Sequence, residues 1–330
     1  MSATNKIDYV YILSASHSGS TLLAMLMNSH PDMTTIGETS PGKMGDINKY
    51  RCSCGRIIIE CPFWENVIVE MQKKHPEFYF DHFGTKFDCV SKPIINRLLL
   101  FEHRGIFLEF LRDNMLRLFP YWRQSKHAIM TRCYDLATIV LSLSGGRIFV
   151  DSSKLAHRLK FLLHIPEFSI KVIHLVRDGR AVALTYMNQD EFGDSKDISL
   201  RRGGMGIKAE ATTASLPMEK AADEWRRCLR SAKHILRGLD KSQWIEIHYE
   251  DLCRDTEAVL GRLFTFLGLE SGKRVKDFRS VEQHVIGNGM RLDTTSQVVL
   301  DERWRTVLTK DDLKTFDRIA GAMNRRYGYE

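Results

Sequence analysis

Residues 10–31 read VYILSASHSGSTLLAMLMNSHP, an apolar run that passes through small residues into a second apolar run. This order predicts a strand, a short loop and a helix that begins near residue 20. The first N–H groups of a helix have no acceptor inside it, and they lie at the positive end of its dipole. Such a loop is an anion-binding site, which we expect to be formed by Ser18, Gly19, Ser20 and Thr21. Gly19 lets the backbone come close to the anion.

The P-loop of nucleotide triphosphatases, G-x-x-x-x-G-K-[ST], can be laid on residues 14–21 with its second glycine at Gly19. Ser14 then replaces the first glycine, and Ser20 stands where the lysine that holds the β- and γ-phosphates is needed. ATP-type phosphoryl transfer would lose its main electrostatic component here. The loop therefore suits a smaller anionic group.

The loop resembles that of the sulfotransferases that use 3′-phosphoadenosine 5′-phosphosulfate (PAPS) as donor. Their 5′-phosphosulfate loop is a strand, a basic residue, a Ser-Gly-[ST]-[ST] sequence and a helix, which is matched by Ser18, Gly19, Ser20, Thr21 and Leu22. One position departs from the family. His17 stands where the family has Arg or Lys, and it can be a cation only if its pKa allows. By itself the loop also fits another phosphate binder or plain packing.

A second segment, residues 171–186, resembles the family's 3′-phosphate site, a buried strand that ends in Arg-Asp-x-Arg at the start of a helix. Arg177 is its key residue, because a planar guanidinium can bind a phosphate through two parallel hydrogen bonds. Thr185 stands where the family has a serine on the same phosphate. The alternative is an Arg-Asp pair that only caps the helix.

Two later segments complete the resemblance. Residues 244–252 end in Tyr-Glu-Asp-Leu, and the resemblance gives Tyr249 a place in the adenine pocket. Residues 284–291 resemble the late loop that closes over the 3′-phosphate, a role that falls to Asn288, Gly289 and above all Arg291. Four segments in the family's order identify the chain as a member of the PAPS-dependent sulfotransferases. The branch is bacterial-type, closer to the carbohydrate and tyrosylprotein members than to the cytosolic phenol and steroid members.

The fold class expected is α/β, a P-loop-like central parallel sheet flanked by helices. Nearly continuous apolar runs predict strands at residues 9–13, 33–36, 147–150, 171–176 and 244–248, as in a sheet covered on both faces. An apolar stripe predicts a helix over residues 218–239. We expect a single domain over residues 1–330, although the length alone would allow two. We expect a helical substrate cap at about residues 40–130 and a candidate mobile lid at about residues 188–217.

The formal net charge of +7 suits a multiply anionic nucleotide. No dense Lys/Arg run marks a nucleic-acid face, so DNA or RNA is not an expected partner. Residues 1–8 are polar, without a signal sequence, and no apolar run is long enough to span a bilayer. We therefore expect a cytoplasmic protein of bacterial origin. The Golgi members of the family carry a membrane anchor ahead of the catalytic domain, which this chain would lack unless it was trimmed.

The chain has seven cysteines. Three of them, Cys52, Cys54 and Cys61, suggest a zinc site, but their spacing is not a paired C-x-x-C set. No fourth ligand is adjacent in the sequence, so His75 or His82 would have to supply it. We therefore expect reduced cysteines in a loop and no metal. The other four are expected to be small core residues: Cys89, Cys133, Cys228 and Cys253.

The resemblance implies O-sulfation, in which an acceptor oxygen attacks in line and charge builds on the leaving phosphate, with no metal needed. The best candidate for the general base is Glu38, at the end of the second strand, because related members have a Gly-Glu at this position whose glutamate is the base. The alternative is that Glu38 is only a solvated or helix-capping carboxylate. His17, if protonated or donating, would stabilise the leaving group, and Lys154 would assist. The acceptor is a hydroxyl of a small molecule or a glycan. Alternative functions are a P-loop-like small-molecule kinase and a catalytically inactive nucleotide-binding protein.

Overall fold

The computed structural model describes residues 6–41, 44, 46–89, 92–99, 106–188 and 216–330. Its centre is a five-stranded sheet in the order β2-β3-β1-β4-β5, in which every neighbouring pair is parallel. The expected strands are confirmed, with these bounds: β1 Ile7–Ser14, β2 Met33–Thr35, β3 Ile148–Lys154, β4 Phe168–Val176 and β5 Trp244–His248. Since all strands run the same way, their carboxyl ends meet at one edge of the sheet. The expected α/β class is also confirmed.

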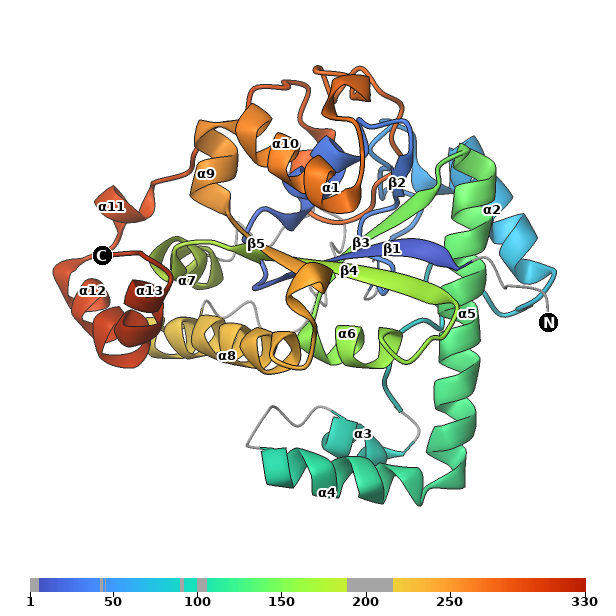
Figure 1. Ribbon diagram of the computed structural model, residues 1–330, viewed down its shortest axis with the longest axis horizontal. Coiled ribbons are helices and arrows are strands. Elements are labelled where there is room, and N and C mark those ends of the chain that lie inside the picture. Colours follow the sequence, from blue (N-terminus) through green and yellow to red (C-terminus); the bar gives the residue numbers. More distant parts are fainter. Residues whose placement is uncertain (1–5, 42–43, 45, 90–91, 100–105, 189–215) are drawn as a thin grey trace.

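Helices cover both faces of the sheet, as Figure 1 shows. The helices are α1 Ser20–Met27, α2 Pro62–Gln72, α3 Pro93–Leu99, α4 Ile106–Arg117, α5 Pro120–Ser144, α6 Ala156–Leu162, α7 Gly179–Met187, α8 Met218–Leu236, α9 Tyr249–Arg254, α10 Thr256–Leu267, α11 Trp304–Val307, α12 Lys310–Phe316 and α13 Ala322–Arg326. On one face Val10 and Ile12 pack with α1 and α10. On the other face Tyr9 and Tyr11 pack with α5, α6 and the end of α8. This alternation buries both sides of β1.

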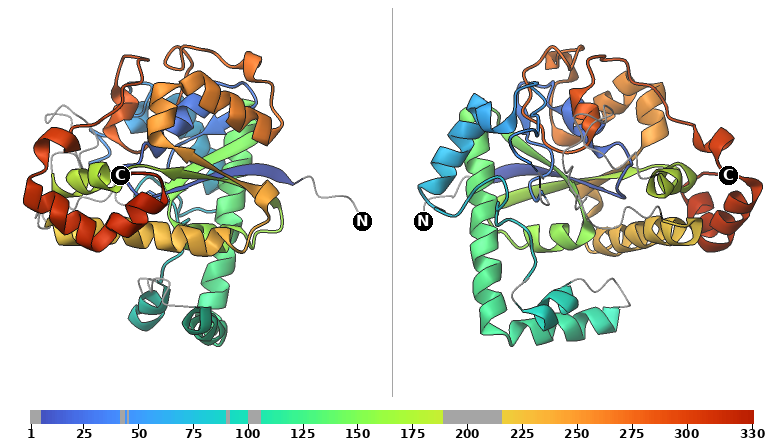
Figure 2. Two further views of the ribbon diagram at one scale, coloured as in Figure 1. Left: turned by 60° about the vertical axis from the view of Figure 1, so that its left-hand side comes forward. Right: turned by 180° about the vertical axis from the view of Figure 1, so that it is seen from behind.

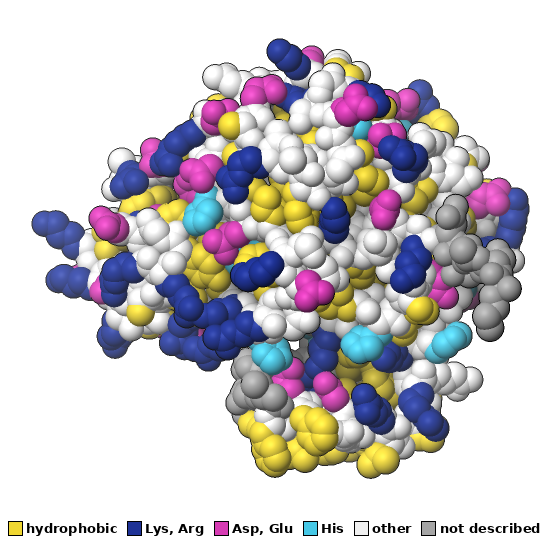
Figure 3. Space-filling view, in the orientation of Figure 1, with side chains coloured by type: hydrophobic (Ala, Val, Ile, Leu, Met, Phe, Trp, Pro, Cys, Tyr) yellow, Lys and Arg dark blue, Asp and Glu magenta, His cyan; other side chains and the backbone are white. Residues whose placement is uncertain are grey.

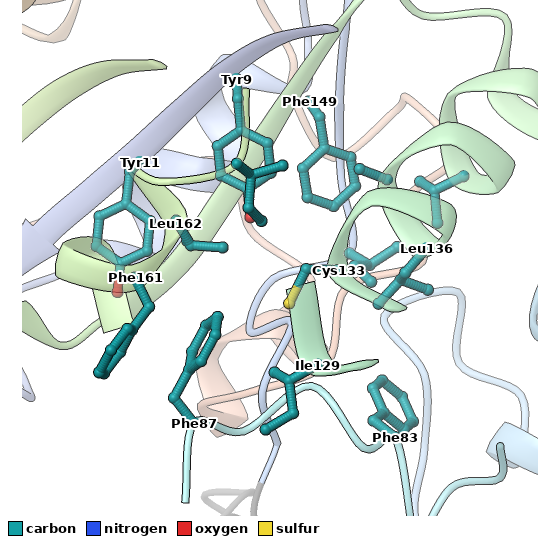
Figure 4. Close-up of a cluster of buried hydrophobic side chains, with 14 of the residues drawn as sticks. Tyr9, Tyr11, Phe83, Phe87, Ile129, Cys133, Leu136, Phe149, Phe161 and Leu162 are labelled. Atoms are coloured by element: carbon teal, nitrogen blue, oxygen red, sulfur yellow. The ribbon is translucent and has the colours of Figure 1, made fainter. Parts of the chain in front are cut away.

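The core beneath β1 is aromatic. In Figure 4 the rings of Tyr9, Tyr11 and Phe149 face α5 and α6, with the Cys133 thiol among them. Cys89 and Cys133 are buried as expected, whereas the other two cysteines expected in the core are half-buried: Cys228 and Cys253. The helix expected over residues 218–239 is confirmed as α8, which ends at Leu236.

Among the described residues of the range 40–130, the longer elements are helices, as expected: α2, α3, α4 and the first part of α5. Figure 1 shows α3 and α4 set apart from the sheet, with α5 leading back to it. Apolar side chains on this part are exposed, among them Ile94 and Phe107, and Figure 3 shows hydrophobic side chains gathered over the same region. The boundary of a substrate cap stays a prediction. The expected lid over residues 188–217 lies almost wholly outside the described residues.

The carboxyl-terminal helices α12 and α13 lie beside α8 in both views of Figure 2. Phe316 and Ala320 join the core formed by α7 and α8. None of the helices within the described ranges is both long and apolar enough to cross a membrane.

Candidate functional site

The loop after β1 lies at the carboxyl edge of the sheet, where α1 begins. Gly19 caps α1 in the left-handed conformation, with φ of 87°. A Cβ at Gly19 would lie 2.5 Å from Tyr249 Cδ2, so only glycine lets that ring pack against the loop. The Ser18 hydroxyl is buried and has no hydrogen-bond partner in the part of the chain that the structure describes. A buried hydroxyl in this state has unused capacity for a ligand.

Arg177 reaches the same loop from the end of β4. Its Nη1 donates to His17 O over 2.8 Å, and its Nη2 donates to Asp301 Oδ2 over 2.9 Å. The guanidinium lies over the Tyr249 ring at 4.5 Å from the ring centre. Its Nε is buried and has no partner among the described residues. The structure therefore brings Arg177 and Tyr249 to the anion loop.

Helix capping was the alternative role for the Arg-Asp pair, and Asp178 performs it without Arg177. Asp178 caps α7 by accepting from Arg180 N over 2.9 Å, and its carboxylate also pairs with the Arg180 guanidinium. Arg177 is thus not used by the cap. Thr185 is less favourably placed, because its buried hydroxyl donates to Ala181 O inside α7. The structure does not show the Thr185 hydroxyl directed at a ligand site.

Glu38 lies just beyond β2, where it forms an ion pair with Lys154 at the end of β3. Both side chains are largely buried. A Cβ at Gly287 would lie 3.6 Å from Thr21 Oγ1 and 3.8 Å from Glu38 Oε1, so the loop hydroxyl and the carboxylate flank one point. The structure therefore brings Glu38 and Lys154 to the same edge as the anion loop, as the sequence predicts for Glu38.

Two residues of this edge have strained backbones. His17 and Lys154 have φ of 63° and 70°, and they are the non-glycine residues with positive φ among those described. Such conformations cost on the order of 1–3 kcal/mol each and persist where the surroundings enforce them, often at functional sites. Here His17 lies within the loop between β1 and α1, and Lys154 is the last residue of β3.

His17 is a neutral imidazole in this structure. Burial, together with the charges of Lys154 and Arg177, lowers its pKa from 6.5 to about 3. At neutral pH it therefore cannot supply the positive charge that the family's Arg or Lys provides, which disfavours the protonated alternative; a neutral His17 that donates a hydrogen bond stays a prediction. Lys154 and Arg177 are cations that lie near His17, and both contribute to its low pKa.

This assignment predicts the titration of two histidines. His17 should stay neutral from pH 8 down to pH 5, because its pKa lies below that range. His248 should become protonated within it, because the hydrogen bond to Glu246 raises its pKa. Histidine ring chemical shifts, assigned with a His17→Gln variant and followed by NMR across this range, measure both. A His17 midpoint near 6.5 would contradict the assignment.

Arg291 has a different role from the one expected. Its buried guanidinium donates to Arg51 O over 3.0 and 2.8 Å and to Gly287 O over 2.6 Å, and it lies 4.4 Å from the centre of the Tyr50 ring. Backbone carbonyls thus take its donors, and the residue holds the late loop against residues 50–51. This geometry does not support a phosphate ligand role, because Nε, Nη1 and Nη2 of Arg291 all donate to backbone carbonyls. The sequence could not reveal these carbonyls, because they meet Arg291 only in the folded chain.

Asn288 and Gly289 serve the same loop locally. The Asn288 side chain accepts from Met290 N over 3.0 Å and caps a short 3₁₀ turn, in which Gly289 is buried. A role of either residue on the donor stays a prediction.

Comparisons with known proteins fit this geometry. Residues 116–272 match the model of a family described as the sulfotransferase family. The matched segment includes β4 and β5, which are followed directly by Arg177 and Tyr249. The match places residues 116–272 of the chain in the sulfotransferase family. It is 27% identical to mouse carbohydrate sulfotransferase 5 over 173 residues, which are 51% of this chain and 44% of that protein. It is 25% identical to human carbohydrate sulfotransferase 2 over 222 residues, which are 60% of this chain and 41% of that protein.

The chain thus spans less than half the length of these curated relatives. Among solved structures, a sulfotransferase domain from the curacin biosynthetic pathway is similar over 98% of both chains, with a TM-score of 0.45 and 16% identity.

One feature of this chain was not predicted from the sequence. Cys52, Cys54 and Cys61 meet His284, and the four ligand atoms lie within 4.8 Å of one another. As expected, no fourth ligand is adjacent in the sequence, but the fold supplies one that was not considered: His284, from a loop 223 residues beyond Cys61. His75, considered from the sequence, instead pairs with Asp135 over 2.8 Å.

Proposed function

We propose that this chain is a PAPS-dependent O-sulfotransferase that transfers a sulfuryl group to a hydroxyl of a glycan or small molecule. The observation that carries the proposal is the shared edge of the sheet. There the loop of Ser18 and Gly19, the Arg177 guanidinium and the Glu38–Lys154 pair lie together. Family membership supports the same reaction class.

The donor would be held by groups that have spare capacity. The unpartnered Ser18 hydroxyl and the N–H groups at the start of α1 suit the 5′-phosphosulfate, with Lys154 as the neighbouring cation. Arg177 has an unpartnered Nε, and its Nη2 is paired with Asp301, whose pKa is lowered by hydrogen bonds from Arg303 and then from Arg177. A 3′-phosphate would replace the Asp301 carboxylate as the partner of Arg177. The Tyr249 ring, beside Arg177, fits an adenine contact.

The reaction needs a general base for the acceptor hydroxyl and a cation at the leaving group. The acceptor oxygen forms a bond to sulfur while the bond between sulfur and the bridging phosphate oxygen breaks, and the electron pair goes to the phosphate. Glu38 takes the acceptor proton, and Lys154 stabilises the charge that develops on the phosphate oxygen. Glu38 and Lys154 already lie in contact with each other before the substrates bind. Positioning and electrostatics then supply most of the catalysis.

The acceptor is proposed from the relatives. Both curated proteins are named carbohydrate sulfotransferases, which favours a glycan hydroxyl over other hydroxyls. The exposed apolar side chains of α3 and α4 would suit an acceptor with an apolar part. A cytoplasmic location, a bacterial origin and turnover without a metal stay predictions.

Donor binding tests the proposal. The chain should bind 3′-phosphoadenosine 5′-phosphate (PAP), the product nucleotide, more tightly than AMP, which lacks the 3′-phosphate. Loss of one charge-assisted phosphate contact costs about 1.5–3 kcal/mol, a difference of about tenfold or more in affinity. Arg177→Ala should remove most of the preference. Calorimetry with PAP, AMP and ATP with magnesium measures all three affinities.

The matched control is Arg254→Ala, because Arg254 is an exposed arginine on α9 that faces Asp251 and solvent. It should leave the preference for PAP unchanged. Equal affinity for PAP and AMP in the unmodified chain would contradict the proposal, and preferential binding of ATP with magnesium would favour a kinase.

A further inference from the structure

The four-residue cluster of Cys52, Cys54, Cys61 and His284 has the dimensions of a zinc site. Cys61 Sγ lies 3.3 Å and Cys52 Sγ 3.7 Å from His284 Nδ1, and Cys54 Sγ lies 3.7 Å from Cys61 Sγ. In a tetrahedral site with Zn–S of about 2.3 Å and Zn–N of about 2.0–2.1 Å, neighbouring ligand atoms are about 3.5–3.8 Å apart. The three distances lie at or slightly below the edges of such a tetrahedron.

His284 is oriented as a metal ligand would be. Its Nδ1 faces the sulfur atoms, and its Nε2 lies 3.3 Å from Glu282 Oε1. The Phe63 ring stacks on the imidazole at 4.3 Å with an interplanar angle of 4°. A carboxylate on the far nitrogen of a ligating histidine fixes the ring and raises its basicity. This second contact is independent of the distances between the ligand atoms.

Backbone hydrogen bonds also hold Cys52 and Cys54 in position. Gly55 N donates to Cys52 O over 2.9 Å and Cys52 N donates to Arg56 O over 3.0 Å, which forms a tight turn around Cys54. Gly55 has φ of 85°, which this turn requires. Ser53 ties the turn to the late loop, because its hydroxyl donates to Gln283 O over 2.6 Å and accepts from Val285 N over 2.7 Å. The two segments are joined before a metal enters.

We propose that Cys52, Cys54, Cys61 and His284 bind one Zn²⁺ ion. Three thiolates and one imidazole favour zinc over the hard cations Mg²⁺ and Ca²⁺. Four protein ligands leave no open position, so the ion is structural and takes no part in sulfuryl transfer. The proposal departs from the sequence-based expectation of no metal, and it does not depend on the proposed function.

The site would act on the segment that supports Glu38. Two residues after His284, Ile286 pairs with the segment that follows β2: its N donates to Ile36 O over 2.9 Å, and its carbonyl accepts from Glu38 N over 3.4 Å. A Cβ at Gly37 would lie 2.1 Å from Ile286 O, so this contact is close. Loss of the metal should therefore loosen residues 52–61, the late loop and the support of Glu38 together.

Metal content tests the inference. The full chain, expressed with zinc in the medium and purified without chelator, should contain one zinc per chain by elemental analysis. Cys54→Ser, at a half-buried position, should lower the zinc content strongly. Cys228→Ser is the matched control, because Cys228 is a half-buried cysteine outside the cluster, and it should keep the zinc. Cobalt added to metal-free chain should give the absorption of a tetrahedral thiolate site.

Three results would overturn the inference. The first is an unmodified chain that lacks zinc and does not take up cobalt. The second is the same zinc content in Cys54→Ser as in the unmodified chain. The third is a native mass that is two hydrogens lower, with a disulfide between Cys54 and Cys61 found by peptide mapping. PAP binding, measured on the same preparations, reports separately on the proposed function.

Discussion

Glu38→Gln should lower turnover by about a hundredfold to ten-thousandfold while donor affinity barely changes. The substitution keeps the shape of the side chain but removes the carboxylate that would accept the acceptor's proton. It leaves the anion loop and Arg177 untouched, so PAP affinity should stay close to that of the unmodified chain. Steady-state rates with PAPS and PAP calorimetry measure the two effects.

The matched control is Glu270→Gln, which removes a carboxylate that pairs with Lys273 over 3.0 Å at an exposed position. It should leave turnover unchanged. His17 is the competing base, but a pKa near 3 makes it a poor proton acceptor at neutral pH. If Glu38→Gln were nearly as active as the unmodified chain and His17→Ala were inactive with normal PAP affinity, His17 would be the base.

Lys154→Met should lower turnover by about a hundredfold to a thousandfold, the range found when one preorganised group that stabilises developing charge is removed. The reason is electrostatic: with a low pKa His17 is uncharged at neutral pH, and Arg177 is assigned to the 3′-phosphate, so Lys154 is the cation proposed to act on the leaving group. Methionine keeps the length of the side chain and meets the same positive φ, so the backbone strain is matched. Lys154→Arg keeps the charge and should retain more activity. Rates with PAPS for the three proteins test this.

A second readout separates charge from packing. Because Lys154 is one cause of the low pKa of His17, Lys154→Met should raise that pKa, although burial remains the largest cause. Lys154→Arg should leave it low. Unchanged turnover in Lys154→Met, with a raised His17 pKa, would show that the charge is present but not used in the reaction.

Much of the fold follows from local patterns in the sequence. The apolar runs at residues 9–13 and 171–176 become β1 and β4, because a parallel sheet buries both faces of its strands. The loop at Ser18 and Gly19 could be predicted because strand, loop and helix are consecutive. Arg177 reaches that loop because β4 lies next to β1 in the sheet.

The rest depends on contacts between distant segments. The role of Arg291 could not be predicted, since the carbonyls of Arg51 and Gly287 converge on it only in the folded chain. His284 joins Cys61 for the same reason. The sequence interpretation allowed His17 to carry a positive charge. Its low pKa could not be predicted, because it depends on burial and on the charges of Lys154 and Arg177, which no local pattern contains.

The most direct test of the central claim is the fate of the donor. PAPS carrying a labelled sulfuryl group is incubated with the purified chain and a panel of glycans and hydroxyl-bearing small molecules, in parallel with γ-labelled ATP and magnesium. The account predicts that label moves from PAPS to an acceptor hydroxyl with stoichiometric release of PAP, and that Glu38→Gln and Lys154→Met suppress both. Transfer of label from ATP while PAPS stays intact would contradict it.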